Sequence, residues 1–430
     1  MKERLGSIVI LLAMSVSAMA AEQPVYTLQD SYDAALSSYE GVKISEENVV
    51  QADSRVDQAW TYIYPRLTAY GGYTRYNDVL PPGGGAFIFQ PEEQVNASLI
   101  LTQPLYTGGR TLAALRAAKT MRESSRSGLT AVKQDIMLGV ADAYYAVIKA
   151  QKIVEVSRGS LERMERHKKV TEREASTRRT KANASSLLRA NALVEQARIA
   201  LIRAEDGLKI ARRKLGLLTR LPENSIFAEP SPLTLPQGTV ESLLETAYKY
   251  RDDYASSRLN TQVAKEFVTI TEGGHYPQVY AEAGVRYQDS DPKTGMDDTT
   301  YYGGVRLQIP LFEGGLMKAE VSEARSKQRQ AELSTVLFKR NIENEVQEAY
   351  INCQTLDAVL ETARRQFEYA KGNFDAVESL FAEGLAPSLS VIDAEQGLFL
   401  AERELTAAAF DQQLAILRLQ KRLGVLGKKL

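Results

Sequence analysis

Four short stretches of the chain alternate between apolar and polar residues, two in each half of the sequence. The clearest runs from Val279 to Tyr287, where every second residue is apolar. A period of two is typical of strands whose two faces meet different surroundings. We therefore expect strands at about residues 66–76, 94–103, 278–288 and 299–309. On alternation alone, a soluble sandwich and a membrane barrel fit equally well.

Tyrosines near the ends of these strands favour the membrane interpretation. They are Tyr70, Tyr73, Tyr76, Tyr280, Tyr287, Tyr301 and Tyr302. Aromatic residues at both interfaces form the girdles of outer-membrane strands. The segments 77–93 and 289–298 between paired strands are rich in Pro, Gly and Asp, so we expect exposed loops there.

Each strand pair is followed by a long stretch with helical periodicity. Apolar residues recur every three or four positions from Leu129 to Val154, and no proline occurs between Arg110 and Arg179. This pattern predicts a helix of roughly 100 Å, at 1.5 Å per residue. A shorter, alanine-rich helix follows in each half. We expect two hairpins, at about 110–216 and 315–423, packed as coiled coils.

The two halves of the chain resemble each other in sequence. Tyr64-Pro65 recurs as Tyr276-Pro277, and the stretch from Gln103 to Gly109 recurs from Ile309 to Gly315. The matches keep the same order, which predicts an internal repeat. The expected organisation is a first repeat at 21–220, a proline-rich connector at 221–238 and a second repeat at 239–430. Ahead of them, residues 1–20 have the charged start, apolar middle and small-residue end of a secretory signal peptide.

The composition of the chain argues against a catalytic function. The chain of 430 residues has a formal net charge of -1, one cysteine and two histidines. A disulfide framework and a Cys-rich or His-based metal site are therefore not expected, and neither is attraction to nucleic acid. No carboxylate stands in an apolar setting that suggests a general acid, and we expect His167 and His275 to be ordinary surface residues and Cys353 to pack in the long helix. We predict no catalytic residue, no metal and no cofactor.

The repeated Pro-Leu-aromatic-x-Gly-Gly motif, the paired strands and the duplicated hairpins together resemble the TolC-type outer-membrane efflux proteins. The resemblance covers nearly all of residues 26–424. It implies a mixed fold, a membrane β-barrel continued by an α-helical coiled-coil barrel. Each protomer of a homotrimer would give four strands to a twelve-stranded barrel and two long helical hairpins to a periplasmic tunnel. Four strands cannot close a barrel alone, and an open edge cannot face lipid, which independently requires several copies.

The resemblance also implies the function and the partners. We expect a passive duct in the bacterial outer membrane, for efflux of small toxic compounds or for type I protein secretion. It would contact outer-membrane lipid, a periplasmic adaptor protein and an inner-membrane pump. The alternatives are a periplasmic coiled-coil adaptor, which does not explain the duplicated strands, and a secreted enzyme, for which no site is present.

Three groups of residues are candidates for function. The first group lies in the strand-to-helix turns, where we expect proline to end the hydrogen-bonded strand and glycines to allow the sharp turn. The residues of this group are Pro104, Gly108, Gly109, Pro310, Gly314 and Gly315. By the resemblance, adaptor docking maps to the hairpin tips, at Thr180, Lys181, Ala182, Gly384, Leu385, Ala386 and Pro387. The expected tunnel gate comprises Arg178, Arg179, Glu383, Ser390 and Asp393.

The gate departs from the family pattern. Ala386 stands where relatives have an arginine after the turn glycine, and Ser390 stands at an acidic position. We therefore expect Arg178 or Arg179 on the first hairpin to pair with Glu383 or Asp393 on the second.

Overall fold

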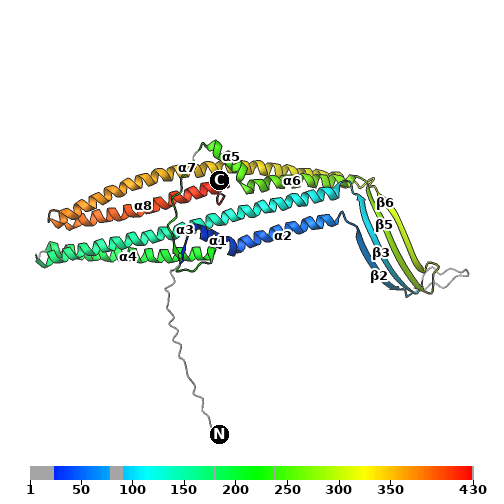
Figure 1. Ribbon diagram of the computed structural model, residues 1–430, viewed down its shortest axis with the longest axis horizontal. Coiled ribbons are helices and arrows are strands. Elements are labelled where there is room, and N and C mark those ends of the chain that lie inside the picture. Colours follow the sequence, from blue (N-terminus) through cyan, green and yellow to red (C-terminus); the bar gives the residue numbers. More distant parts are fainter. Residues whose placement is uncertain (1–23, 78–90, 178–180, 237, 429–430) are drawn as a thin grey trace, which may run out of the picture.

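The computed structural model describes residues 24–77, 91–177, 181–236 and 238–428. Long helices lie side by side in an elongated bundle, and a curved sheet continues it at one end (Figure 1). The two helical hairpins extend side by side toward the opposite end, where the first hairpin contacts the second (Figure 1). The expected signal peptide at residues 1–20 lies outside the described residues.

The order of elements is the same in the two halves of the chain. The first half contains α1 (Leu28–Ser38), α2 (Glu40–Thr61), β2 (Arg66–Arg75), β3 (Glu93–Tyr106), α3 (Arg110–Thr177) and α4 (Lys181–Thr219). The second half contains α5 (Val240–Tyr250), α6 (Asp252–Glu272), the short 3-10 helix η1 (Gly273–His275), β5 (Gln278–Asp291), β6 (Asp298–Gln308), α7 (Leu316–Ala382) and α8 (Ser388–Arg422). The four strands and the two long hairpins confirm the predicted elements.

Helices α2 and α6 were not predicted. The buried positions of α2 are Val42, Ser45, Ala52, Val56 and Ala59. Only the two valines are strongly apolar, so few residues mark the packed face of this helix in the sequence. These helices connect the sheet to the middle of the bundle and lie against α3 (Figure 1).

The main core lies where the helices meet the connector between the halves. Tyr144 on α3 is fully buried, and its hydroxyl lies 2.5 Å from the carbonyl oxygen of Ala228 and 3.1 Å from that of Tyr26. Tyr26 lies in the short strand β1 (Val25–Tyr26), and Ala228 directly follows the short strand β4 (Ile226–Phe227), which pairs with β1 in parallel. Strand β4 lies inside the segment expected to be a connector. The buried hydroxyl is satisfied by backbone, which ties the start of the described chain to the long helix.

A second tie involves Arg251 at the corner between α5 and α6. Its side chain is almost fully buried and pairs with Asp253 and Glu345, each at 2.7 Å. The arginine thereby joins this corner to α7 and holds the pKa of the Asp253 carboxyl below its usual value, against the opposing effect of burial. Cys353, also on α7, is buried in the same region, as predicted.

The sheet has the order β2-β3-β5-β6, and all neighbouring strands are antiparallel. Strands β3 and β5 come from different halves of the chain, so their pairing joins the two repeats. Strands β2 and β6 are the edges, and neither has an outer partner within the described chain.

Candidate functional site

The sheet has one apolar face that is continuous across all four strands. Residues directly opposite each other in antiparallel strands share a face. Leu99 lies opposite Ala69 and Val285, and Val285 lies opposite Tyr301. The same face contains Leu67, Gly71, Tyr73, Val95, Ala97, Leu101, Val279, Ala281, Ala283, Tyr287, Gly303, Val305 and Leu307. The predicted alternation is therefore confirmed, and it is in phase from strand to strand.

The opposite face is polar. It contains Arg66, Thr68, Asn96, Ser98, Thr102, Glu282, Arg286, Arg306 and Gln308. The same face also contains Ile100, Tyr70, Tyr280 and Tyr302, so these three tyrosines do not lie on the apolar face as an interfacial girdle requires. Arg306 pairs with Glu282 across β5 and β6. On β3 the apolar residues are exposed while their polar neighbours are half-buried, so the polar face is the inner side of the curved sheet. An apolar outer side and a polar inner side suit a sheet that separates lipid from an aqueous passage.

The strand-to-helix turns use glycine for their backbone conformation. All four glycines have positive φ: +65° at Gly108, +81° at Gly109, +60° at Gly314 and +88° at Gly315. Other residues rarely adopt this conformation, so the expected role of the glycines is confirmed. The prediction for proline was half right. Strand β6 ends before Pro310, but β3 continues past Pro104 to Tyr106 with a register irregularity, a place where a strand tolerates proline.

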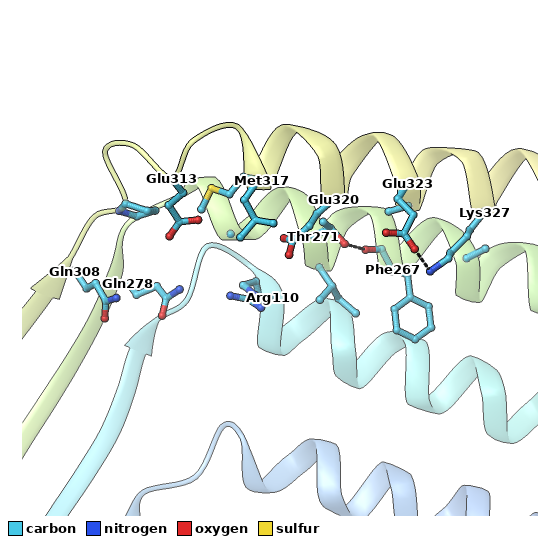
Figure 2. A pocket seen from close by; sticks show the side chains of 16 residues that line it. Arg110, Phe267, Thr271, Gln278, Gln308, Glu313, Met317, Glu320, Glu323 and Lys327 are labelled. Atoms are coloured by element: carbon cyan, nitrogen blue, oxygen red, sulfur yellow. Dashed lines mark hydrogen bonds and ion pairs between the residues drawn. The ribbon is translucent and has the colours of Figure 1, made fainter.

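A hollow of about 540 Å³ lies beside the second of these turns. Figure 2 shows Arg110, at the start of α3, between the ends of β5 and β6 and the helices α6 and α7. Gln278, Gln308 and Glu313 line the end of the hollow near the strands (Figure 2). This hollow marks the junction between sheet and helices, where residues of both halves meet.

The second hairpin tip is a tight, exposed turn. Gly384 has φ of +77°, and its N–H donates to the carbonyl of Phe381 at 2.9 Å, so a left-handed glycine ends α7 as expected. Leu385 is 72% exposed, whereas Ala386 packs on the apolar cluster around Phe381. Pro387 caps α8 in an extended conformation.

The first tip is described only in part. Arg178, Arg179 and Thr180 lie outside the described residues, and α4 begins at Lys181, followed by Ala182. On the second hairpin, Glu383 and Asp393 are exposed and Ser390 is half-buried. The expected pairing between the gate residues of the two hairpins therefore remains a prediction.

A buried ionic cluster joins the two hairpins at a position that sequence reasoning missed. Glu395 on α8 is only 5% exposed and accepts hydrogen bonds from the Ser160 hydroxyl at 2.6 Å and from Arg163 at 3.4 Å. Arg163 also pairs with Glu402 at 2.9 Å. Burial raises the pKa of the Glu395 carboxyl, an effect that Ser160 and Arg163 oppose.

We expected no carboxylate in an apolar setting that suggests a general acid. Glu395 is buried, but Ser160 and Arg163 hydrogen-bond to it, so it belongs to an ionic cluster that the sequence analysis did not predict. Glu395 follows Val391 by four positions and precedes Leu398 by three, so it occupies an apolar position of the helical period. A charge at such a position was the available signal in the sequence.

The prediction of His167 as a surface residue was wrong. It is 6% exposed, its Nε2 lies 2.8 Å from the Ser388 hydroxyl, and its ring packs against Phe381 at 5.0 Å between centroids. Burial lowers the pKa of this histidine. It faces α7 and α8 because the first hairpin lies on the second, which the charged sequence around it did not reveal. His275, by contrast, is exposed as expected.

Within the described ranges, no group of three or more His, Cys, Asp or Glu residues is placed to hold a metal ion. Among the same residues, no helix is sufficiently long and apolar to cross a membrane.

The sequence model of the outer membrane efflux protein family matches residues 31–219 and 243–425, which is most of the chain. This protein belongs to that family. The efflux protein is 22% identical to the outer membrane protein TolC of Vibrio cholerae over 78% of each chain. It is 21% identical to TolC of Escherichia coli, over 98% of this chain and 86% of the relative.

Solved structures show the same fold. The outer membrane protein VceC of Vibrio cholerae superposes with a TM-score of 0.79 at 20% identity, over 92% of this chain and 96% of the other. The efflux protein is therefore an exit duct of the outer membrane with the TolC-type architecture of sheet and helical tunnel. The family match decides between the hypotheses in favour of the duct and against the periplasmic adaptor.

Proposed function

We propose that three copies of this protein form a passive, twelve-stranded duct through the outer membrane, continued by a helical tunnel in the periplasm. The observation that supports the trimer is the sheet, which has a continuous apolar face and two edges that no described residue covers. Unpaired backbone groups cannot face lipid, so the edges must be covered by other copies. Two copies would give eight strands, and a barrel of about eight strands is filled by its own side chains. Three copies give twelve strands, which leave room for a passage.

The two halves of each chain are the structural repeats of this assembly. We propose repeats at 21–220 and 239–430, joined by the connector at 221–238, with residues 1–20 as a signal peptide for export. The repeated order of elements supports this division.

The duct binds no nucleotide and catalyses no reaction in this proposal. An inner-membrane pump supplies energy, and a periplasmic adaptor docks on the tips at Thr180, Lys181, Ala182, Gly384, Leu385, Ala386 and Pro387. The exposed Leu385, held on a rigid glycine turn, supports a docking role, since exposed apolar residues on rigid elements are typical anchors of interfaces.

Substitution Leu385→Trp tests the docking site. We expect it to abolish export of a pump substrate, because the larger side chain cannot enter the surface that accepts leucine, while the protein still reaches the outer membrane. Drug susceptibility and outer-membrane fractionation provide the measurements. Leu385→Met is the matched control, since it keeps apolar character and similar volume. Normal export by the tryptophan variant would place docking elsewhere.

The closed tunnel mouth is the second part of the proposal. Arg178 or Arg179 pairs with Glu383 or Asp393, with Ser390 nearby on α8. Each exposed pair contributes only about 0.2–1 kcal/mol, but threefold symmetry repeats it three times. The exposure of Glu383 and Asp393 leaves both available to a neighbouring hairpin.

Charge reversal at Arg178 and Arg179 is expected to raise single-channel conductance in planar bilayers. The difference should be largest at low salt, where exposed pairs are least screened. The control is Arg213→Glu on α4, an exposed arginine far from the tips. Conductance equal to that of the unaltered protein at low salt would reject this gate.

A further inference from the structure

A hollow of about 350 Å³ lies on the polar face of the sheet, where β2 and β3 meet the helices. The strand residues that line it all belong to the polar face; they are Arg66, Thr68, Tyr70, Thr102, Pro104 and Tyr280. In the proposed duct this face borders the aqueous passage, so the hollow lies on the path of the cargo. We propose that it is a transit site for small aromatic compounds that carry a negative charge. The inference rests on the proposed function and names a class of cargo for it.

The lining has the composition of a site for aromatic rings. Four of its eleven residues are tyrosines and five are threonines. Tyr62, Tyr64 and Tyr70 are more than half exposed, so their rings are accessible to a ligand. Ligand sites combine aromatic side chains, which supply apolar contact, with a few polar groups that fix orientation. An interfacial girdle does not account for Tyr70 and Tyr280, because they lie on the face that points away from lipid.

Two of the tyrosines are held in place by their neighbours. Tyr64 is stacked on Trp60, with 6.0 Å between the ring centroids and 15° between the ring planes. The Tyr280 hydroxyl donates a hydrogen bond to Oε1 of Gln278 at 2.7 Å. Rings that are already fixed lose little rotational freedom when a ligand stacks on them, which favours binding.

Arg66 gives the hollow a positive charge. The described residues that line the hollow include no acidic side chain. The acidic residue in the same row across the sheet, Glu282, lies two strands away and pairs with Arg306. The exposed guanidinium of Arg66 therefore has no carboxylate partner within the described part of the chain. A free guanidinium can bind the carboxylate of a ligand through two parallel hydrogen bonds.

The spacing of the charge and the rings suits a small molecule. Strand β3 separates Arg66 from Tyr280, and the two residues differ by two positions in register. Their backbones are therefore about 12 Å apart, a distance that includes both side chains. A carboxylate bound to Arg66 leaves its attached ring within reach of Tyr280 across the sheet.

The second repeat shows that this lining is not a requirement of the junction between sheet and helices. The Tyr-Pro motif that occurs in both halves makes Gln278 the counterpart of Arg66 and Glu282 the counterpart of Tyr70. The hollow at the second junction is lined by three glutamates, and its described lining contains no tyrosine (Figure 2). The same strand ends thus form with an acidic lining, so folding alone does not explain the tyrosines and the arginine of the first hollow.

Equilibrium dialysis of the full-length protein in lipid nanodiscs tests the site, with 1-naphthoate as the probe and empty nanodiscs as the blank. We expect saturable binding that is weakened roughly tenfold or more by Arg66→Gln, because the carboxylate loses its charged partner. Glutamine stands at the counterpart position 278, so this variant suits the fold. Arg66→Lys keeps the charge without the two parallel hydrogen bonds, and we expect an intermediate affinity.

Arg286→Gln is the matched control. Arg286 lies on the same polar face outside the hollow, so its loss lowers the charge of the passage without changing the site. We expect unchanged binding of naphthoate. Equal binding by Arg66→Gln and the unaltered protein, or equal weakening by Arg66→Gln and Arg286→Gln, would overturn the site.

Two analogues separate the recognition of the ring from that of the charge. Neutral 1-naphthalenemethanol and the non-aromatic anion cyclohexanecarboxylate should each bind the unaltered protein more weakly than 1-naphthoate. Tyr70→Leu should weaken naphthoate binding, whereas Tyr70→Phe, which keeps the ring, should preserve it. An analogue that binds as tightly as naphthoate would overturn the proposed class of cargo.

Native mass spectrometry of the unaltered protein separates the site from the assembly. Trimers without saturable naphthoate binding would reject the transit site and leave the proposed duct intact. Monomers would reject the proposed duct, whether or not naphthoate binds.

Discussion

Replacing Leu99 by arginine is expected to lower the free energy of unfolding in lipid by about 2–4 kcal/mol, the cost of a charge near the middle of the lipid-facing side. Leu99 lies in the interior strand β3 on the apolar face, opposite Ala69 and Val285. The loss should appear as a lower urea midpoint in lipid vesicles and as less membrane-inserted protein in outer-membrane fractions.

Asn96→Arg on the same strand is the matched control. Asn96 belongs to the polar face, where it lies opposite Gly72 and Gln288, so the new charge meets water and has no charged residue directly opposite. We expect near-normal insertion and an altered ion selectivity of the duct. Equal losses from the two substitutions would contradict the assignment of the faces.

Substitution Arg163→Met should destabilise the helical tunnel by about 3–5 kcal/mol, because it leaves Glu395 buried without its cationic partner. Arg163 contacts Glu395 and Glu402 on α8 from the first hairpin, so the loss should also loosen the hairpins and raise single-channel conductance. Urea unfolding followed by helical circular dichroism measures the first effect, and planar bilayers measure the second.

Arg158→Met on the same helix is the control, since Arg158 makes only an exposed pair with Glu205 at 3.8 Å; we expect less than about 1 kcal/mol. Adding Glu395→Met to Arg163→Met should recover most of the stability, because well-packed apolar residues can replace a buried ion pair. A loss no larger for Arg163→Met than for Arg158→Met would show that the cluster does not hold the hairpins together.

The pH dependence of stability gives a further measurement on the same variants. The pKa of Glu395 is raised in the folded protein, so between its ordinary and its raised pKa the folded state binds more protons than the unfolded state. The Glu395 contribution to stability therefore increases as the pH falls through the raised pKa and is constant below the ordinary one. This increase should be absent when Glu395 is replaced by glutamine.

Several features of the site were accessible from periodicity and turn chemistry. Alternation along single strands predicted which residues share a face, because the pleat has a period of exactly two residues. The Gly-Gly pairs and Gly384 predicted turns with positive φ, since that conformation favours glycine regardless of surroundings. The repeat predicted the order of elements in the second half from that in the first.

Other features required the packing of distant segments. Glu395 and His167 are covered where the first hairpin lies along the second. The neighbours of His167 in sequence are largely charged and gave no sign of burial, whereas the apolar neighbours of Glu395 showed its face but not its partners on α3. Pro104 remains in a strand because β5 pairs on both sides of the irregularity next to it. Helix α2 packs against α3, and three of its five buried positions are small residues, so only two valines mark that face in the sequence.

By itself, the sequence determined the four strands of the sheet, the two long hairpins, the apolar face of each strand, the glycine turns and the duplication, because these depend on local geometry and on spacing along the chain. Only the tertiary structure decided that β3 pairs with β5, that neither outer edge has a partner within the described part of the chain, and that Arg163, Glu395 and Glu402 meet between the hairpins. The physical reason is that strand partners and buried charges are set by contacts between residues far apart in the chain. A local period shows which side of an element is apolar, but it contains no information about the surface that covers that side.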